Sequence, residues 1–189
     1  MDAFEHCSVA ILAGGKSSRF GTDKGLTIFQ HKPLIQHVID IANKVSKEVL
    51  IISNDPIYQN FGTPVFNDEF KSKGPLGGLH VALKNSTNNH CFLMACDMPF
   101  LNPELFHGLF KNNHYQAVVP VHQHQPEPLC ALYHSSALPS VEKHLEEGKL
   151  KMTDTIEQLN HHWYHVDENC EFYDSKMFAN INTISDWEN

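Results

Sequence analysis

The sequence lacks the features that mark a membrane or secreted protein. No apolar run in its 189 residues approaches the roughly 20 residues that a transmembrane helix needs. The N-terminal segment, residues 1–6, is acidic, whereas a signal peptide begins with basic residues. Five cysteines, an odd number without framework spacing, predict reduced thiols. We therefore expect a cytoplasmic protein with no membrane partner.

Positive charge is also scarce. The chain has 14 Lys and Arg against 22 Asp and Glu, a formal net charge of −8, which argues against a nucleic-acid partner. Fourteen histidines stand out, and the spacings of His122 with His124 and of His161 with His162 and His165 are compatible with a transition metal. No cysteine or carboxylate accompanies them at ligand spacing. We therefore expect surface or lineage bias here, with no metal bound by these histidines.

Internal repeats, low-complexity tracts and linkers are absent, which predicts a single domain over residues 1–189. Apolar strand patterns alternate with helical ones, and this alternation predicts an α/β fold with three layers, a mostly parallel twisted sheet with helices on both faces. Strands are expected over 8–12, 49–52, 63–66, 90–95, 117–121, 129–133, 163–166 and 178–181, and helices over 33–45, 75–83, 103–110, 138–147 and 153–159, the third capped by Asn102 and the fourth ended by Gly148.

Polar residues follow four of the expected strands. The segment 14–24 follows the first, Asn54 the second, Asp68 the third and Asp97 the fourth. Ligands of such sheets lie beyond the carboxyl ends of the strands. We therefore expect these four groups to meet at one edge.

The loop after the first strand is rich in glycine and locally basic. Lys16, Arg19 and Lys24 outnumber Asp23, so this loop is positive in an acidic chain. Glycines let backbone amides approach a phosphate closely, so the loop suits a polyanionic small ligand. An ordinary strand–helix turn with solvated cations is the alternative.

Two familiar phosphate-binding loops do not match. A Walker A loop would need a glycine where this chain has Ala10. A Rossmann fingerprint needs Gly-x-Gly-x-x-Gly, and Gly14, Gly15 and Gly21 do not have that spacing.

The segment 12–24, Leu-Ala-Gly-Gly-x-Ser-x-Arg-Phe-Gly-x-Asp-Lys, resembles the signature of the MobA-like nucleotidyltransferases, most closely of their molybdenum cofactor guanylyltransferase branch. Further segments match in the family order at 74–79, 96–99, 126–129 and 180–183. The resemblance covers nearly the whole chain. It implies a Rossmann-like fold of the nucleotide-diphospho-sugar transferase type.

The resemblance also implies an activity. GMP is transferred from GTP to the terminal phosphate of the Mo-molybdopterin cofactor, giving molybdopterin guanine dinucleotide and pyrophosphate. Mg²⁺ is the implied cofactor. GTP and Mo-molybdopterin are the implied small-molecule partners, with transient contact to molybdoenzymes or their chaperones.

Roles for individual residues come from the same resemblance. Lys24, Arg19 and Asp97 are the expected catalytic residues, Asp97 also binding the metal, while Asn180 and Asn182 are expected to bind the acceptor on one face of a strand. The alternatives are a solvated Lys24, a turn role for Asp97 and a terminal turn carrying both asparagines. The expected nucleotide-binding residues are Leu12, Ala13, Gly14, Gly15, Lys24, Asn54, Asp68, Gly77 and Asp97.

Three weaker features accompany these. The segment 125–129 matches a stretch near the acceptor side, and whether Glu127 touches substrate stays open. Asp68 can instead serve as a turn residue. Phe20 and Gly25 replace the Met and Ala that are common in the family, and we expect both exchanges to be tolerated.

Other functions compete with the guanylyltransferase reading. A cytidylyl- or sugar-phosphate nucleotidyltransferase would share the mechanism, although cytidylyl relatives typically read Ala-Ala-Gly where this chain has Leu12-Ala13-Gly14. A non-catalytic nucleotide- or cofactor-binding module would predict a damaged cation or metal position, whereas Lys24, Arg19 and Asp97 are present. A generic metal-binding protein leaves the loop signature unexplained.

Overall fold

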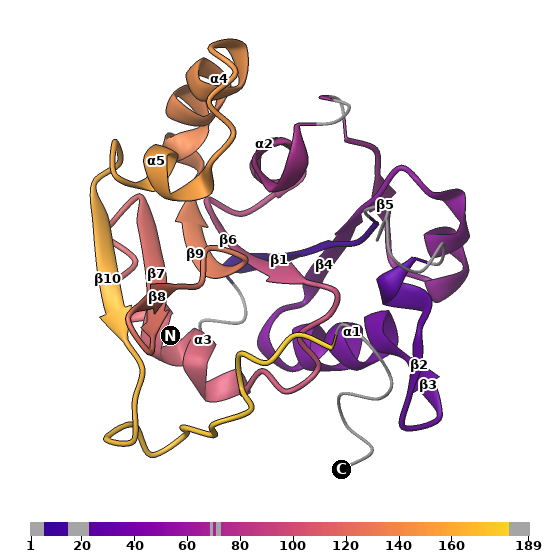
Figure 1. Ribbon diagram of the computed structural model, residues 1–189. Coiled ribbons are helices and arrows are strands. Elements are labelled where there is room, and N and C mark those ends of the chain that lie inside the picture. Colours follow the sequence, from indigo (N-terminus) through magenta and orange to yellow (C-terminus); the bar gives the residue numbers. More distant parts are fainter. Residues whose placement is uncertain (1–5, 15–22, 69, 71–72, 182–189) are drawn as a thin grey trace.

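A mostly parallel β-sheet forms the centre of the protein, as expected (Figure 1). The structure, a computed structural model, describes residues 6–14, 23–68, 70 and 73–181. The strand order is β10-β7-β9-β6-β1-β4-β5, with β8 paired to β7. Strand β9 runs antiparallel to both of its neighbours, and β8 runs antiparallel to β7. The strands are β1 (Cys7–Leu12), β4 (Glu48–Ile52), β5 (Val65–Phe66), β6 (His90–Ala95), β7 (Ala117–His122), β8 (Gln125–Pro126), β9 (Cys130–His134) and β10 (His161–His165).

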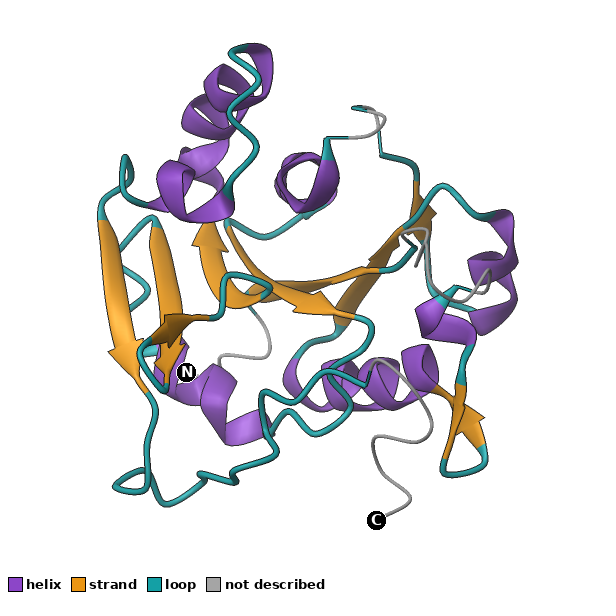
Figure 2. Ribbon diagram, in the orientation of Figure 1, coloured by secondary structure: helices purple, strands orange, loops and turns teal. Residues whose placement is uncertain are grey.

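Helices cover both faces of this sheet, which confirms the three-layer prediction (Figure 2). Helices α1 (Leu34–Val45) and α3 (Pro103–Phe110) pack on one face, and α2 (Gly74–Asn85), α4 (Leu138–Glu146) and α5 (Met152–Ile156) pack on the other. Successive strand residues point to opposite faces. In β1, Val9 and Ile11 therefore join the core under α1 and α3, while Ala10 joins the core under α2.

Local signals placed most element ends correctly. Asn102 Oδ1 accepts a hydrogen bond from the Glu104 N–H at 3.0 Å and caps α3, as expected. Gly148 follows α4 at φ +71°, a left-handed conformation that favours glycine. Helix α5 ends at Ile156, three residues before its expected end.

The expected strand over residues 178–181 is wrong. This segment has no strand pairing, and the Ile181 N–H instead donates to the Asp97 carbonyl oxygen at 3.0 Å. Phe178 and Ile181 are buried, so their apolar character reflects anchoring in the core and not a strand ladder. Asn180 therefore does not lie on a strand, and the expectation that Asn180 and Asn182 share a strand face is wrong.

A hairpin and a helical turn were not expected from the sequence. Strands β2 (Ile28–Phe29) and β3 (Lys32–Pro33) pair across a two-residue turn, and residues 56–61 form a 3₁₀ helix. Within the described part of the chain, no helix has the length and apolar character to cross a membrane.

Candidate active site

The expected polar groups do gather at one edge of the sheet. Strands β1, β4, β5 and β6 are mutually parallel, so their carboxyl ends lie together. Two backbone hydrogen bonds continue the pairing past these ends: the Ala13 N–H donates to the Ile52 carbonyl oxygen at 3.0 Å, and the Cys96 N–H donates to that of Leu12 at 3.1 Å. The backbone around Leu12 and Ala13 is thus fixed where the glycine-rich loop begins.

Lys24 and Asp97 form the central charged pair of this edge. Lys24 opens a 3₁₀ helix, Lys24–Leu26, and its Nζ lies 3.2 Å from Asp97 Oδ2. Their side chains are 34% and 16% exposed, respectively. Lys24 is therefore a partly exposed lysine held in an ion pair with Asp97. A cation and a carboxylate at a strand end are the groups that a triphosphate and a hard divalent cation require.

A buried tyrosine, missed by the sequence analysis, holds the backbone around Lys24. Asp23 caps the 3₁₀ helix: its Oδ1 accepts from the Gly25 N–H at 3.0 Å and from the Tyr58 hydroxyl at 2.5 Å. Tyr58 is fully buried, and burial, with the hydrogen bond to Asp23, raises the pKa of its hydroxyl. The hydroxyl therefore remains a donor at any physiological pH.

Gly25 touches this tyrosine directly. A Cβ atom at Gly25 would lie 2.4 Å from the Tyr58 hydroxyl oxygen and 3.3 Å from Cys96 Sγ. The prediction that glycine here is a neutral replacement for alanine thus misses a steric requirement, since Tyr58 occupies the space that a methyl group needs.

Asn54, Asp68 and Gly77 form a second group of expected site residues. Asn54 Oδ1 accepts from the Asp68 N–H at 3.0 Å. Asp68 Oδ1 accepts from the Phe70 N–H at 2.9 Å, so Asp68 does make a turn, yet its carboxylate also lies against the first turn of α2. A Cβ at Gly77 would be 2.9 Å from that oxygen. The structure therefore brings these three residues together.

Glycines also permit close packing at β1. Gly14 has φ +98°, and a Cβ there would lie 3.1 Å from Ser53 Oγ. A Cβ at Gly78 would lie 2.6 Å from a methyl group of Leu12. The side chain of Leu12 therefore packs directly on the backbone of α2. Arg19, Gly15 and Asn182 lie outside the described residues.

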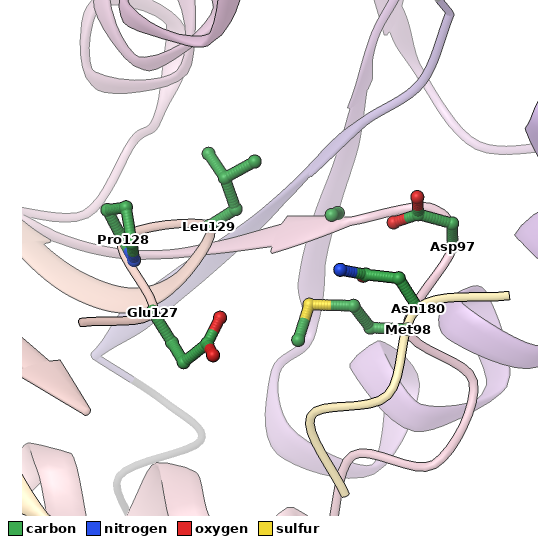
Figure 3. A pocket seen from close by; sticks show the side chains of 7 residues that line it. Asp97, Met98, Glu127, Pro128, Leu129 and Asn180 are labelled. Carbon is green, nitrogen blue, oxygen red and sulfur yellow. The ribbon is translucent and has the colours of Figure 1, made fainter. Parts of the chain in front are cut away.

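A hollow of about 200 Å³ opens beside Asp97 on the β9 side (Figure 3). Asp97 and Asn180 line it, and so do Glu127 and the two residues that follow it along the chain. Burial raises the pKa of Glu127 to about 7. The hollow is lined by Ala95, Asp97, Met98, Glu127, Pro128, Leu129 and Asn180.

The wall that carries Glu127 is held by backbone hydrogen bonds. The Glu127 N–H donates to the Pro120 carbonyl oxygen at 2.8 Å, and the Ala95 N–H donates to that of Leu129 at 2.9 Å. The Tyr133 hydroxyl donates to the Pro128 carbonyl oxygen at 2.8 Å. The sequence suggested a rigid backbone from the two prolines, and these bonds supply the tertiary constraint.

Several of the histidines have structural contacts, His122 and His162 among them. His122 Nε2 lies 3.1 Å from the Tyr173 hydroxyl, and its ring stacks on Phe178 with centroids 5.0 Å apart. His162 stacks on Tyr115 at 5.3 Å. His122 therefore helps to anchor the segment that leads to Asn180.

Comparisons with known proteins show the family of this chain. Residues 9–162 match the model of the MobA-like NTP transferase domain. The chain is 37% identical to a probable molybdenum cofactor guanylyltransferase of Clostridium perfringens, covering 96% of this chain and 94% of that protein. It is 34% identical to a probable molybdenum cofactor guanylyltransferase of Carboxydothermus hydrogenoformans, covering 97% and 94%.

The chain is also similar to solved structures of nucleotidyltransferases and related proteins. The crystal structure of molybdopterin-guanine dinucleotide biosynthesis protein A from Archaeoglobus fulgidus superposes with a TM-score of 0.82 at 29% identity, covering 95% of this chain and 94% of that one. The 2-C-methyl-D-erythritol 4-phosphate cytidylyltransferase of Thermus thermophilus, at 13% identity, has a TM-score of 0.70 and covers 96% and 95%. The latter likeness concerns the fold.

Proposed function

The chain belongs to the MobA-like NTP transferase family, and we propose that it transfers GMP from GTP to the terminal phosphate of Mo-molybdopterin. The products are molybdopterin guanine dinucleotide and pyrophosphate. The relatives from C. perfringens and C. hydrogenoformans, named for this activity, support the substrate assignment over nearly the full chain. The single structural observation that carries the proposal is the Lys24–Asp97 pair at the shared carboxyl edge of β1 and β6.

The reaction is a displacement at the α-phosphorus of GTP. An oxygen of the acceptor phosphate forms a bond to that phosphorus, and the bond from phosphorus to the bridging oxygen breaks, so that pyrophosphate leaves with the bonding electrons. The nucleophile is already an anion, so no protein base is required. Catalysis then consists of positioning and of charge stabilisation, which Lys24 supplies through its ammonium group.

Nucleotide binding falls to the groups on the β1–β4–β5 side. The backbone of Leu12, Ala13 and Gly14 would contact the nucleotide, and Asp68 would do so beside Gly77, where the absence of a side chain leaves room for the carboxylate. We assign the triphosphate to Lys24.

Mg²⁺ is part of the same proposal, with Asp97 as its protein ligand. Among the described residues no group of three or more His, Cys, Asp or Glu is arranged to hold a metal. A magnesium ion held by one carboxylate and by substrate phosphates needs no such group, so the donor set fits. The bound ion would neutralise charge on the phosphate oxygens.

The same proposal places the protein in the cytoplasm, where transient contacts with molybdoenzymes or their chaperones would receive the product. All five cysteines are free thiols, and four of them are buried, which supports a reducing compartment.

The test is nucleotide specificity. Purified protein, Mo-molybdopterin and Mg²⁺ are incubated with GTP, CTP or ATP in turn, and pyrophosphate release is followed. Selective turnover with GTP, lost in Lys24→Ala and Asp97→Ala, is the expected result. Turnover with CTP alone would instead assign the chain to a cytidylyl branch, and GTP binding without turnover would leave only a binding module.

A further inference from the structure

Glu127 is a half-buried carboxylate on the cavity wall that none of the proposed steps uses. It lies between β8 and β9, and Figure 3 shows its carboxyl group directed toward Met98 and Asn180. Among the residues that the structure describes, no donor bonds to this carboxylate, and desolvation alone raises its pKa to about 7. An ionised carboxylate is an acceptor only, so the group calls for N–H or O–H donors from a ligand.

The order of the strands places Glu127 on the acceptor side of the site. Asn54 and Asp68 follow β4 and β5, on one side of β6, whereas Glu127 precedes β9, on the other side. Asp97 follows β6 and stands between these two groups. A nucleotide held from the β1–β4–β5 side therefore leaves the cavity beside Glu127 to the second substrate.

The walls of the cavity combine apolar and polar side chains. Met98, Pro128 and Leu129 present apolar surface, while Glu127 and Asn180 present polar groups. Ligand sites commonly combine apolar walls with a few polar groups that fix orientation. A carboxylate binds best to two parallel N–H donors, the geometry that also makes paired contacts strong and directional.

We propose that Glu127 binds the 2-amino-4-oxo-pyrimidine edge of the acceptor's pterin ring, accepting hydrogen bonds from its ring N–H and its 2-amino group. This inference rests on the proposed function, since it takes a pterin as the acceptor. The guanine of GTP carries the same edge. Glu127 and the expected nucleotide-binding residues lie on opposite sides of Asp97, and this position favours the pterin as the partner of Glu127.

The test uses binding, so that it does not depend on turnover. The probes are 6-hydroxymethylpterin monophosphate and its lumazine counterpart, in which an oxygen replaces the 2-amino group. Fluorescence titrations compare the wild type, Glu127→Gln and Glu127→Asp. The matched control is Glu146→Gln, an exposed position on α4.

We expect the wild type and Glu146→Gln to bind the pterin about tenfold or more tightly than the lumazine, because the 2-oxygen opposes the carboxylate. Glu127→Gln should lose this preference, since an amide can donate to the 2-oxygen. Glu127→Asp should retain part of it. Circular dichroism establishes that each variant is folded.

A second set of titrations distinguishes the pterin ring of the acceptor from the guanine ring of GTP as the group that Glu127 binds. GTP and ITP, which lacks the 2-amino group, are compared on the same variants. Under the proposal their ratio of affinities is unchanged in Glu127→Gln. A changed GTP/ITP ratio with an unchanged pterin/lumazine ratio overturns the proposal, and so does equal or undetectable binding of both pteridines to the wild type.

Failure of the proposed function has a different signature. Absence of GMP transfer by the wild type, together with a pterin preference lost in Glu127→Gln, would reject the guanylyltransferase activity and leave Glu127 as a pterin-binding residue. Transfer by the wild type with no effect of Glu127→Gln on the pterin preference would reject only the role of Glu127.

Discussion

Lys24 Nζ lies 3.2 Å from Asp97 Oδ2, although the two residues are 73 positions apart in the sequence. Each neutralises the other at an edge where a triphosphate and a divalent cation are expected to bind. The pair therefore keeps the ammonium group at the edge before any ligand arrives.

Asp97→Asn is expected to separate nucleotide binding from catalysis. Without Mg²⁺, the variant should bind GTP about twofold to tenfold more tightly than the wild type, because a carboxylate that repels the triphosphate and competes for Lys24 is gone. Its Mg²⁺-dependent turnover should fall by about two orders of magnitude or more. Calorimetric titration with GTP in EDTA, and then pyrophosphate release, measure the two effects. Weaker metal-free binding would contradict this role.

Gly25→Ala is expected to destabilise the fold through Tyr58. The new methyl group would lie 2.4 Å from the tyrosine hydroxyl oxygen in the absence of movement. Overpacking of this kind costs about 1–3 kcal/mol in the free energy of unfolding. Tyr58→Phe removes that oxygen and also its hydrogen bond to Asp23, so the double variant should be more stable than the sum of the single changes predicts. Urea unfolding of all four proteins checks this, and strict additivity would refute it.

Gly77→Ala is expected to act on the nucleotide through Asp68. A Cβ 2.9 Å from Asp68 Oδ1 would push the carboxylate away from α2. We expect KM for GTP to rise about tenfold with little change in KM for the acceptor. The control is Asp68→Ala, in which a further Gly77→Ala should add no more than about twofold. Equal effects in the presence and absence of the Asp68 carboxylate would show that Gly77 acts by another route.

Glu127→Gln is expected to change the pH dependence of stability. The pKa of Glu127 is about 7 in the fold against an ordinary value of 4.5. Below pH 4.5 Glu127 is protonated in both the folded and the unfolded chain, so its ionisation does not change the free energy of unfolding. Stability conferred by the neutral carboxyl group is then lost as pH rises toward 7, since the unfolded chain releases its proton first. The wild type therefore loses stability relative to Glu127→Gln between pH 4.5 and 7. The difference in the free energy of unfolding should be on the order of 1 kcal/mol, after allowance for the partial exposure of Glu127.

Thermal unfolding of both proteins from pH 4.5 to 8 measures this difference. Glu146→Gln, at an exposed position, should show no such trend. A difference between Glu127→Gln and the wild type that stays constant with pH would contradict the raised pKa.

Strongly patterned elements could be predicted from the sequence. Strand β6 has the bounds that its apolar run indicated, and Asn102 caps α3 because an amide before proline satisfies the free N–H groups of a helix start. The meeting of Asn54, Asp68 and Asp97 at one edge followed from the parallel order of the strands alone.

Other features depend on tertiary contacts and have weak local signals. The β2–β3 turn places Gln30 and His31 at positive φ, although glycine or asparagine usually marks such turns. Tyr58 acts on Asp23 from 35 positions away, so no local pattern connects them. The apolar residues near Asn180 are buried without strand pairing, which made that segment look like a strand.

The reversed direction of β9 gives the two halves of the site different architectures. The β1–β4–β5 half is built by loops that leave parallel strands, whereas Glu127 lies in a connection that enters an antiparallel one. An insertion or deletion between β8 and β9 can therefore reshape the second half without changing the register of the strands that carry the first. Selectivity for the two substrates can diverge independently, by changes in separate loops of one scaffold.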